Sequence, residues 1–411
     1  MKAKNRSGHV EEGLVNEKYL RKTRWLLVLL CLSLTWCAAP WKPREVSKPE
    51  PPKADLPWLD LPKVEPITVQ ISDVKVDRNL FNPTRGEIVA VSYRISKPAK
   101  VIIKIFDPEM FLVRDLMSEY KGGPEPDQVT WDGRDSEGRI VPDETYFFTI
   151  EATDYQGKHT FYDPTTISGG EIFSPQLTFD KQENRLFYQL PKDARVRIRA
   201  GISAGGPLLK NIIHGVPKLS GNHEEVWEGK DESGTIDIIQ QEKYVISAEA
   251  VSLPENSIFA SGNKEYDYFK YKNDITPERP KKVERPLFQS KRNPLEGPSN
   301  WPLSIGPEPR FHIDLPGLVR KTTDGLPVVK GKTPIRIYLD QTIKRYVTEQ
   351  RYEILFFVDY KFVTEREEGY SPFNLFWDTA EVSNGEHVIT VNVVTLTGQV
   401  SSASMKVMVQ N

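Results

Sequence analysis

Apolar and polar residues alternate in short runs along most of the chain beyond residue 66. Within 88–95 apolar side chains fall at every second position, and after a turn containing Pro98 the alternation resumes at Val101, Ile103 and Ile105. A period of two predicts β-strands with one buried face. Turn residues separate these runs and no helical period interrupts them, so the pattern predicts an all-β protein with almost no helix.

The order of strands and turns recurs just under 100 residues later. WDGRDSEG at 131–138 matches WEGKDESG at 227–234 at an offset of 96, and YFFTIEA at 146–152 matches YVISAEA at 244–250 at an offset of 98. Drift this slow over a whole domain indicates duplication of one unit of sandwich size. The repeat predicts two successive β-sandwiches.

A third unit begins near Phe311. Alternating residues at 335–339, an apolar strand at 354–358 and the phrase NGEHVITV at 384–391 lead to a final alternating strand. A chain of 411 residues is long enough for about three domains. The sequence therefore predicts three small cores.

The residues also carry a family resemblance. Residues 79–157 show FNP, a strand through Y-x-I, A-x-V-x-I, then W-D-G-x-D-x-x-G-x-x-V-P and Y-x-F-x-I-x-A, an order that resembles the Ig-like domain of the flagellar hook-capping protein. Residues 175–252 are similar to a degraded copy, with Ile236-Asp237 in place of Val-Pro, and residues 350–411 look like bacterial Ig-like modules of secreted carbohydrate-active and adhesive proteins. The resemblance implies three tandem immunoglobulin-like sandwiches.

The N-terminal sequence is typical of a targeting segment. Basic residues precede an apolar run from Trp25 to Trp36 that is too short to span a bilayer comfortably. Cys37 followed by Ala38 and Ala39 resembles a lipoprotein signal, in which the cysteine is acylated, although the residue before it is a tryptophan and not a small residue. Three alternatives stay open: acylation of Cys37, cleavage near Ala38 or Ala39, and an uncleaved anchor. All three predict an extracytoplasmic location, in the periplasm or at the cell surface.

The domain limits follow from these features. A proline every few residues favours a stiff extended tether after the signal. An irregular stretch separates the second and third units, and we interpret it as a linker or extended arm. The expected order is signal 1–37, tether 38–66, first Ig-like domain 67–168, second 169–256, linker or arm 257–305 and third 306–411.

Charge and cysteine content narrow the function. Residues 1–36 carry seven Lys/Arg and three Asp/Glu, so their removal would change the formal charge from −2 to −6. A body without a basic excess is a poor partner for nucleic acid. The only cysteines are Cys31 and Cys37, so a folded body beyond them forms no disulfide and relies on core burial.

One candidate site is the acidic turn with Asp132, Asp135 and Glu137, whose three carboxylates are the oxygen ligands that Ca²⁺ prefers. The alternative, which we favour, is turn chemistry that recurs in the second copy, with carboxylates serving only a solvated turn and no bound metal or other cofactor.

Aromatic residues offer two further candidates. Trp131, Trp227 and Trp377 each end a strand before an acidic turn, and we expect buried sandwich tryptophans and not sugar-stacking platforms. Tyr266, Tyr268, Phe269 and Tyr271 could form an arm that contacts a partner or could pack within the chain, and packing is the preferred alternative.

We expect no enzyme. The histidines share no ligand-like spacing, and no HExxH, GxSxG or phosphate-cradling glycine loop occurs. The preferred function is a non-catalytic scaffold or protein-binding protein of the bacterial envelope, with other envelope proteins as partners. A carbohydrate-binding or adhesive surface protein, which would need exposed aromatic residues on one sheet face, is the first alternative. A flagellar or secretion-apparatus accessory is the second.

Overall fold

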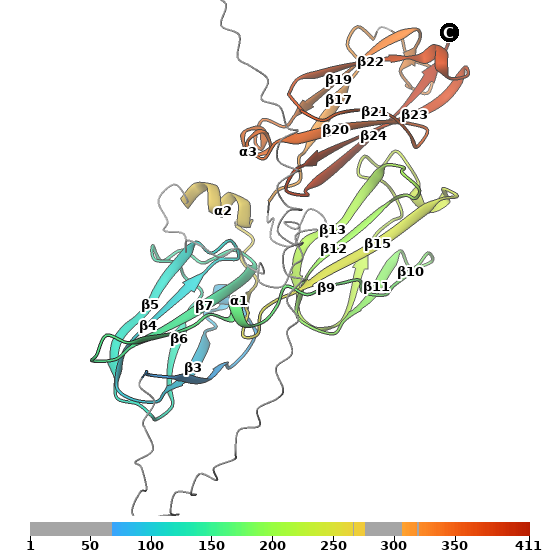
Figure 1. Ribbon diagram of the computed structural model, residues 1–411. Coiled ribbons are helices and arrows are strands. Elements are labelled where there is room, and N and C mark those ends of the chain that lie inside the picture. Colours follow the sequence, from blue (N-terminus) through green and yellow to red (C-terminus); the bar gives the residue numbers. More distant parts are fainter. Residues whose placement is uncertain (1–67, 266, 276–305, 319) are drawn as a thin grey trace, which may run out of the picture. The chain divides into compact units, whose positions relative to one another are not determined.

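The computed structural model describes residues 68–265, 267–275, 306–318 and 320–411 (Figure 1). The chain divides into two compact units between Lys63 and Val64, and every element below belongs to the second unit. The predicted signal, Cys37, the proline-rich tether and Tyr266 lie outside the described residues.

The first β-sandwich, called sandwich 1, packs a three-stranded sheet (β1–β3–β6) against a larger sheet in the order β2–β16–β7–β4–β5, in which β8 also pairs with β7. In β3, alternate side chains from Val89 to Ile95 are buried, as the period of two predicts. The elements contributed by the first part of the chain are β1 (Ile71–Val76), β2 (Leu80–Phe81), the 3-10 helix η1 (Pro83–Arg85), β3 (Val89–Ile95), β4 (Ala99–Phe106), β5 (Leu112–Lys121), β6 (Asp127–Trp131), β7 (Glu144–Thr153) and β8 (His159–Tyr162).

Sandwich 2 repeats this arrangement with the sheets β10–β11–β14 and β13–β12–β15–β9. Its core lies between the two sheets and includes Leu186, Val196 and Ile198. A short helix, α1 (Pro164–Ile167), precedes its elements, which are β9 (Ile172–Phe173), β10 (Leu177–Asp180), β11 (Arg185–Leu190), β12 (Ala194–Ile202), β13 (Leu208–Lys218), β14 (Gly221–Val226), the 3-10 helix η2 (Ile238–Gln240) and β15 (Tyr244–Ser252).

Strand β16 (Ile258–Ala260) follows sandwich 2 in the sequence but belongs to sandwich 1. It runs parallel to β2 and antiparallel to β7, and Phe259 is paired with Leu80 on one side and with Thr145 on the other. Sandwich 2 is therefore an insertion between β8 and β16 of sandwich 1. The structure corrects the start of the expected linker 257–305, because a three-residue strand is too short to show an alternation in the sequence.

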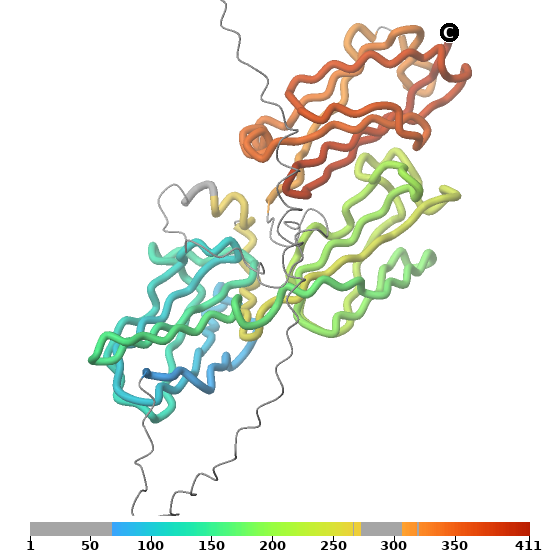
Figure 2. The backbone as a smooth tube through the Cα atoms, in the orientation of Figure 1, coloured from blue at the N-terminus to red at the C-terminus, as the bar shows by residue number. Residues whose placement is uncertain are grey.

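Sandwich 3 consists of the sheets β17–β19–β22 and β18–β24–β23–β20–β21 around a third core. Figure 2 follows its backbone in orange and red. Its elements are β17 (Phe311–Asp314), β18 (Val328–Val329), β19 (Lys332–Leu339), α3 (Lys344–Glu349), β20 (Tyr352–Val358), β21 (Lys361–Arg366), β22 (Phe373–Asp378), the 3-10 helix η6 (Thr379–Glu381), β23 (Gly385–Thr395) and β24 (Val400–Val409).

The all-β prediction is confirmed. All three cores lie between β-sheets, and the α-helices of the described part are short. They are the four-residue α1, the eight-residue α2 (Tyr268–Ile275) and the six-residue α3. None of the helices in the described part is long and apolar enough to cross a membrane.

Candidate functional site

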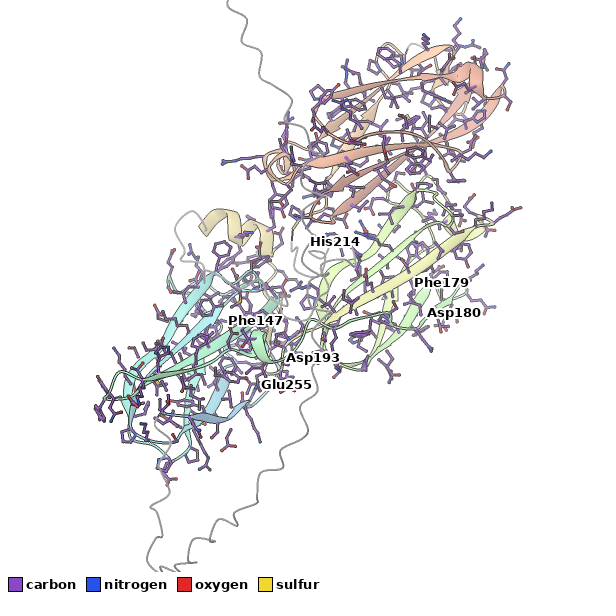
Figure 3. All side chains as sticks on the ribbon, viewed as in Figure 1. Phe147, Phe179, Asp180, Asp193, His214 and Glu255 are labelled. Carbon is purple, nitrogen blue, oxygen red and sulfur yellow. The ribbon has the colours of Figure 1, made fainter. Side chains whose placement is uncertain are left out.

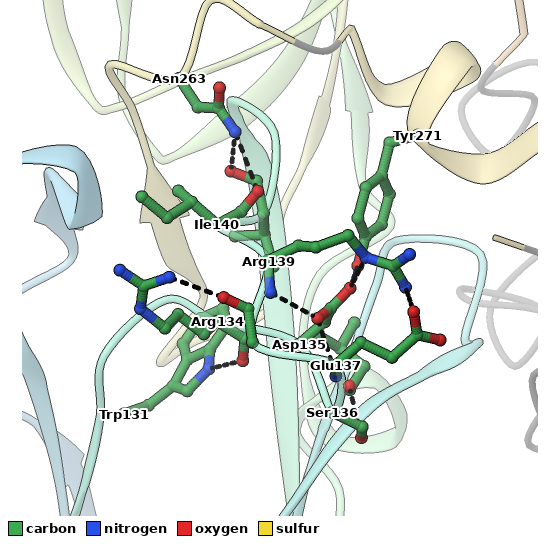
Figure 4. Close-up of polar contacts among 12 residues, drawn as sticks. Trp131, Arg134, Asp135, Ser136, Glu137, Arg139, Ile140, Asn263 and Tyr271 are labelled. Carbon is green, nitrogen blue, oxygen red and sulfur yellow. Dashed lines mark hydrogen bonds and ion pairs between the residues drawn. The ribbon is translucent and has the colours of Figure 1, made fainter. Parts of the chain in front are cut away.

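The acidic turn of sandwich 1 starts at Trp131, the last residue of β6 (Figure 4). The indole is fully buried and packs against the rings of Phe81 and Tyr146, with centroids 5.5 and 5.2 Å away. Its Nε1 donates a hydrogen bond of 2.9 Å to the carbonyl oxygen of Arg134. The same side chain therefore fills the core and holds the start of the turn.

Asp135 is the central carboxylate of the turn and is only 3% exposed. Oδ1 accepts hydrogen bonds from the backbone N–H groups of Glu137 and Arg139, at 3.0 and 2.9 Å. Oδ2 accepts from Nε of Arg139 at 2.9 Å and from the hydroxyl of Tyr271 at 3.0 Å (Figure 4). The expectation of a solvated turn is wrong for this side chain, because its oxygens are bonded inside the protein.

Asp132 and Glu137 point to other partners. Oδ1 of Asp132 accepts from Nη1 of Arg114 at 2.7 Å, and Glu137, which is exposed, pairs with Nη2 of Arg139 at 2.6 Å. Burial alone would lower the pKa of Arg139, but the hydrogen bond to Asp135 and the two nearby carboxylates outweigh it and raise that pKa. Each of the three acidic side chains of the turn is therefore paired with an arginine, and Arg139 is shared by two of them.

The structure uses residues beyond β16 to close this turn. We call residues 256–275 the return strap, because they bring the chain back to sandwich 1. Nδ2 of Asn263 donates to the carbonyl oxygens of Ile140 and Val141 at 2.9 and 3.1 Å. Nothing in the sequence around Asn263 signals this contact, because its partners are backbone atoms 123 and 122 residues away.

Helix α2 of the strap covers the end of sandwich 1 with its aromatic residues. Tyr271 is fully buried, and the hydroxyl of Tyr268 donates to Oε2 of Glu109 at 3.1 Å. Burial, together with nearby carboxylates, raises the pKa of Tyr268, so this hydroxyl keeps its proton. Phe269 packs against the core of sandwich 3, with its ring 5.0 Å from that of Tyr346. The described members of the aromatic run thus pack within the chain, which leaves little of Tyr268 or Tyr271 for a partner.

The second copy of the turn, in sandwich 2, has the same backbone bonding. Nε1 of Trp227 donates to the carbonyl oxygen of Lys230 at 2.9 Å, and Oδ1 of the buried Asp231 accepts from the backbone N–H of Ile236 at 2.8 Å. The turn is one residue longer here, so Ile238 takes the core position of Val141 and donates from its N–H to the carbonyl oxygen of Gly229. Because of this extra residue, Val141 corresponds to Ile238. The prediction from sequence that Ile236-Asp237 replaces Val141-Pro142 was therefore wrong.

Trp377, the third tryptophan, lies in β22 and is 3% exposed. The residue after it, Asp378, caps the 3-10 helix η6 by accepting from the N–H of Ala380 at 3.1 Å. The resemblance of this turn to the other two therefore stops at the buried tryptophan.

A buried ion pair joins sandwich 1 to sandwich 2. Nη2 and Nη1 of Arg195 in β12 lie 2.5 and 3.2 Å from the carboxylate oxygens of Glu144 in β7, and both side chains are about 5% exposed. Nη1 also donates to the carbonyl oxygen of Gly215 at 2.6 Å. A bidentate pair of this kind fixes geometry, and loss of either partner leaves a buried charge.

Apolar and polar contacts surround this ion pair. Phe147 of β7, labelled in Figure 3, belongs to an apolar cluster with Leu253 and Phe259. Asp193 accepts from Nδ2 of Asn79 at 3.1 Å and from the N–H of Ser220 at 2.8 Å. No local sequence pattern predicts this junction, because its residues lie far apart in the chain.

The chemistry that these groups can perform is limited by their partners. Within the described ranges, no group of three or more His, Cys, Asp or Glu side chains is arranged to hold a metal ion. At the acidic turn a cation would have to displace Arg114 and Arg139 from the carboxylates with which they form ion pairs. The arrangement acts as a structural link.

Comparison with known proteins gives only weak structural similarity. No family model and no curated protein matches the chain. The fibronectin(III)-like modules of CbhA from Clostridium thermocellum are 10% identical over 84% of this chain and 94% of theirs, with a TM-score of 0.18.

Two adhesin structures give similar values. Part of a 1.5-MDa bacterial ice-binding adhesin is 9% identical over 84% of this chain and 98% of its own, with a TM-score of 0.17. A tetra-tandem repeat from the extending region of a large adhesion protein is 11% identical over 84% and 74%, also at 0.17. Scores this low carry no functional argument, and the fold assignment rests on the strands themselves.

Proposed function

We propose that the chain is a non-catalytic scaffold of the bacterial envelope, whose Ig-like modules space and bind other envelope proteins. The observation that carries the proposal is the insertion of sandwich 2 into sandwich 1, closed by the return strap. A pair of modules tied by β-ladder bonds and a buried ion pair keeps a fixed shape, which suits a spacer.

Three buried titratable side chains support this proposal, because they act as structural links. Asp135 organises a turn, and Glu144 joins two sandwiches. His387 has hydrogen-bond acceptors at both ring nitrogens, Asp359 at 2.6 Å and the carbonyl oxygen of Ser383 at 2.8 Å. Catalysis needs such groups to converge on a substrate position, and these are occupied with one another.

Location and anchoring are part of the same proposal. The apolar run before Cys37 favours export, and acylation of Cys37 would hold the scaffold at a membrane. Replacement of Cys37 by serine should move the protein from the membrane fraction to the soluble fraction. Unchanged fractionation would favour simple cleavage or an uncleaved anchor.

Crosslinking in intact cells tests the scaffold function. A tagged full-length chain should capture a small, reproducible set of envelope proteins, and a Glu144→Gln variant, which loosens the module pair, should lose part of that set. Arg345→Gln is a matched control, because this exposed side chain forms an ion pair with Glu349 on its own helix, α3, away from the module pair. Capture of glycans without proteins would contradict the proposal, and so would the same captured set from all three chains.

A second candidate, carbohydrate binding, is favoured by one observation. On the outer face of the sheet β17–β19–β22, Tyr338 pairs with His312 across the strands and Phe376 pairs with Pro334. Phe376 is 67% exposed and Tyr338 37% exposed. If this face binds polysaccharide, migration in gels containing polysaccharide should be retarded for the natural chain and not for Phe376→Ala. Equal migration would remove this candidate.

A further inference from the structure

The covalent path of the chain does not pass through the sandwiches one after another. It enters sandwich 1 at β1, leaves after β8, builds sandwich 2, and returns as β16 before it continues from α2. Both the entry and the exit of this path therefore lie on sandwich 1. Tension applied between residue 68 and residue 275 acts on sandwich 1 first, whatever the placement of sandwich 2.

The return strap is bonded to sandwich 1 at both of its ends. At its start, Asn256 accepts from the N–H of Val76 at 3.3 Å and donates from Nδ2 to the carbonyl oxygen of Val74 at 3.2 Å and to the hydroxyl of Tyr162 at 2.9 Å. At its end, Tyr271 reaches Asp135. Removal of the strap must break both groups of contacts.

The middle of the strap is a strand in a buried ladder. The N–H of Phe259 donates to the carbonyl oxygen of Asn79 at 2.6 Å, and the N–H of Ser261 donates to that of Phe81 at 3.1 Å. Ile258 is fully buried in the core of sandwich 1. Strands on both sides of β16 make its removal a concerted rupture, because ladder bonds on two sides must yield together.

Gly262 fits the strap closely to sandwich 1. Its φ is +98°, and a Cβ atom there would lie 2.3 Å from Nδ2 of Asn82. Only glycine adopts this conformation at such a close approach without displacing a neighbour.

We propose that the return strap is a mechanical clasp, which resists tension along the chain and so shields sandwich 2 from it. Sandwich 2 is stretched only after the strap leaves β2 and β7, because until then both of its ends are joined to a closed sandwich 1. The inference rests on the proposed scaffold function only for the source of the tension. The order of rupture is a property of the chain alone.

Single-molecule stretching of the full chain from its two ends tests the clasp. Release of residues 256–275 should add roughly 70 Å of chain, since an extended residue spans about 3.5 Å. This short step should precede every event that belongs to sandwich 2. An event of sandwich 2 before the strap step would overturn the proposal, and so would the absence of a short step.

Two variants show which unfolding event belongs to the strap and which belongs to sandwich 2. Trp227→Phe weakens sandwich 2 and should lower the force of a later event only, while Asn263→Ala weakens the strap and should lower the force of the short step. If Trp227→Phe does not fold, Asp231→Asn weakens the same sandwich through its turn. A lower force of the short step in either sandwich 2 variant contradicts shielding. Failure here leaves the capture of envelope proteins unaffected, so the two proposals fail separately.

Discussion

The two copies of the acidic turn share a local structure and differ in the side chains that bond to their buried aspartate. In sandwich 1 the buried Asp135 is bonded to Arg139 and to Tyr271 of the return strap. In sandwich 2 the position of Arg139 is taken by the buried Ile236, and Oδ2 of Asp231 accepts from the hydroxyl of Ser233 at 2.5 Å. Both side-chain oxygens of Asp231 are therefore bonded within the turn itself.

This difference separates the local interactions that shape the turn from the tertiary contacts that are added to it. In both copies a glycine with φ above +70° follows the residue after the tryptophan, Gly133 in one and Gly229 in the other. Both copies also place the aspartate where it receives backbone N–H groups, so the turn itself fixes its shape. The bond between Asp135 and Arg139 lies within the turn, whereas the bond from Tyr271 is an addition that serves the closure of sandwich 1.

The largest expected effect is loss of the tryptophan that begins each turn. Trp131→Ala and Trp227→Ala should each lower the free energy of unfolding by about 3 to 5 kcal/mol, because each leaves a large cavity. Chemical denaturation followed by tryptophan fluorescence measures this. A loss below about 1 kcal/mol in either copy would show that its indole does not belong to a core.

The next effect distinguishes the two aspartates. Asp135→Ala should cost about 3 kcal/mol, because Arg139 and the hydroxyl of Tyr271 lose a buried partner, while Asp231→Ala should cost about 2 kcal/mol. Tyr271→Phe, which removes only the hydroxyl, should bring the cost of Asp135→Ala closer to that of Asp231→Ala in a double-mutant cycle. Equal costs for the two aspartates in the natural background would contradict the added role of the strap.

A smaller effect concerns pH and a third aspartate. In sandwich 3, Asp359 forms a hydrogen bond with His387. Burial alone would lower the pKa of His387, but hydrogen bonds to Asp359 and to the carbonyl oxygen of Ser383 raise it. A raised pKa means that the stabilisation is complete below about pH 6.5 and is lost as the pH rises through the folded-state pKa.

Denaturation at a series of pH values measures this effect. Relative to His387→Gln, the natural chain should lose about 1 kcal/mol between pH 6 and pH 9. The turn of sandwich 1 should contribute no such slope, since arginine stays protonated throughout this range. A natural chain and variant with parallel pH profiles would rule out the charged pair.

The smallest expected effect is that of a chelator on the acidic turn. Because the carboxylates of the turn already form ion pairs with Arg114 and Arg139, EDTA should leave the melting temperature of the natural chain unchanged. A fall in melting temperature that added Ca²⁺ reverses and Asp135→Ala abolishes would instead establish a cation site.

The sequence predicted what depends on local pattern. Alternation in β3 and β4 and the repeated tryptophan turns were enough to predict sandwiches, because strand faces and turn types are set by neighbouring residues. The return strap could not be predicted in this way. Its strand has three residues, Ile258 to Ala260, and its partners Leu80 and Tyr146 lie more than 100 residues earlier in the sequence.

The candidate site was predicted in part for the same reason. The sequence indicated the acidic residues of the turn, but Asp135 was expected in solvent, because neither Arg139 as its partner nor the cover provided by α2 follows from spacing. The buried pair of Glu144 with Arg195 had no sequence signal, since a glutamate and an arginine 51 residues apart are common in any chain.

The late position of β16 in the sequence also sets the order in which the protein can fold. A chain that emerges N-terminus first presents β1 to β8 with a gap between β2 and β7, and this gap stays open until about 100 further residues have followed. Unpaired strand edges of this kind attract other strands. Every strand of sandwich 2 is therefore synthesised before the last strand of sandwich 1, and sandwich 2 is able to fold while the first module along the chain is still open.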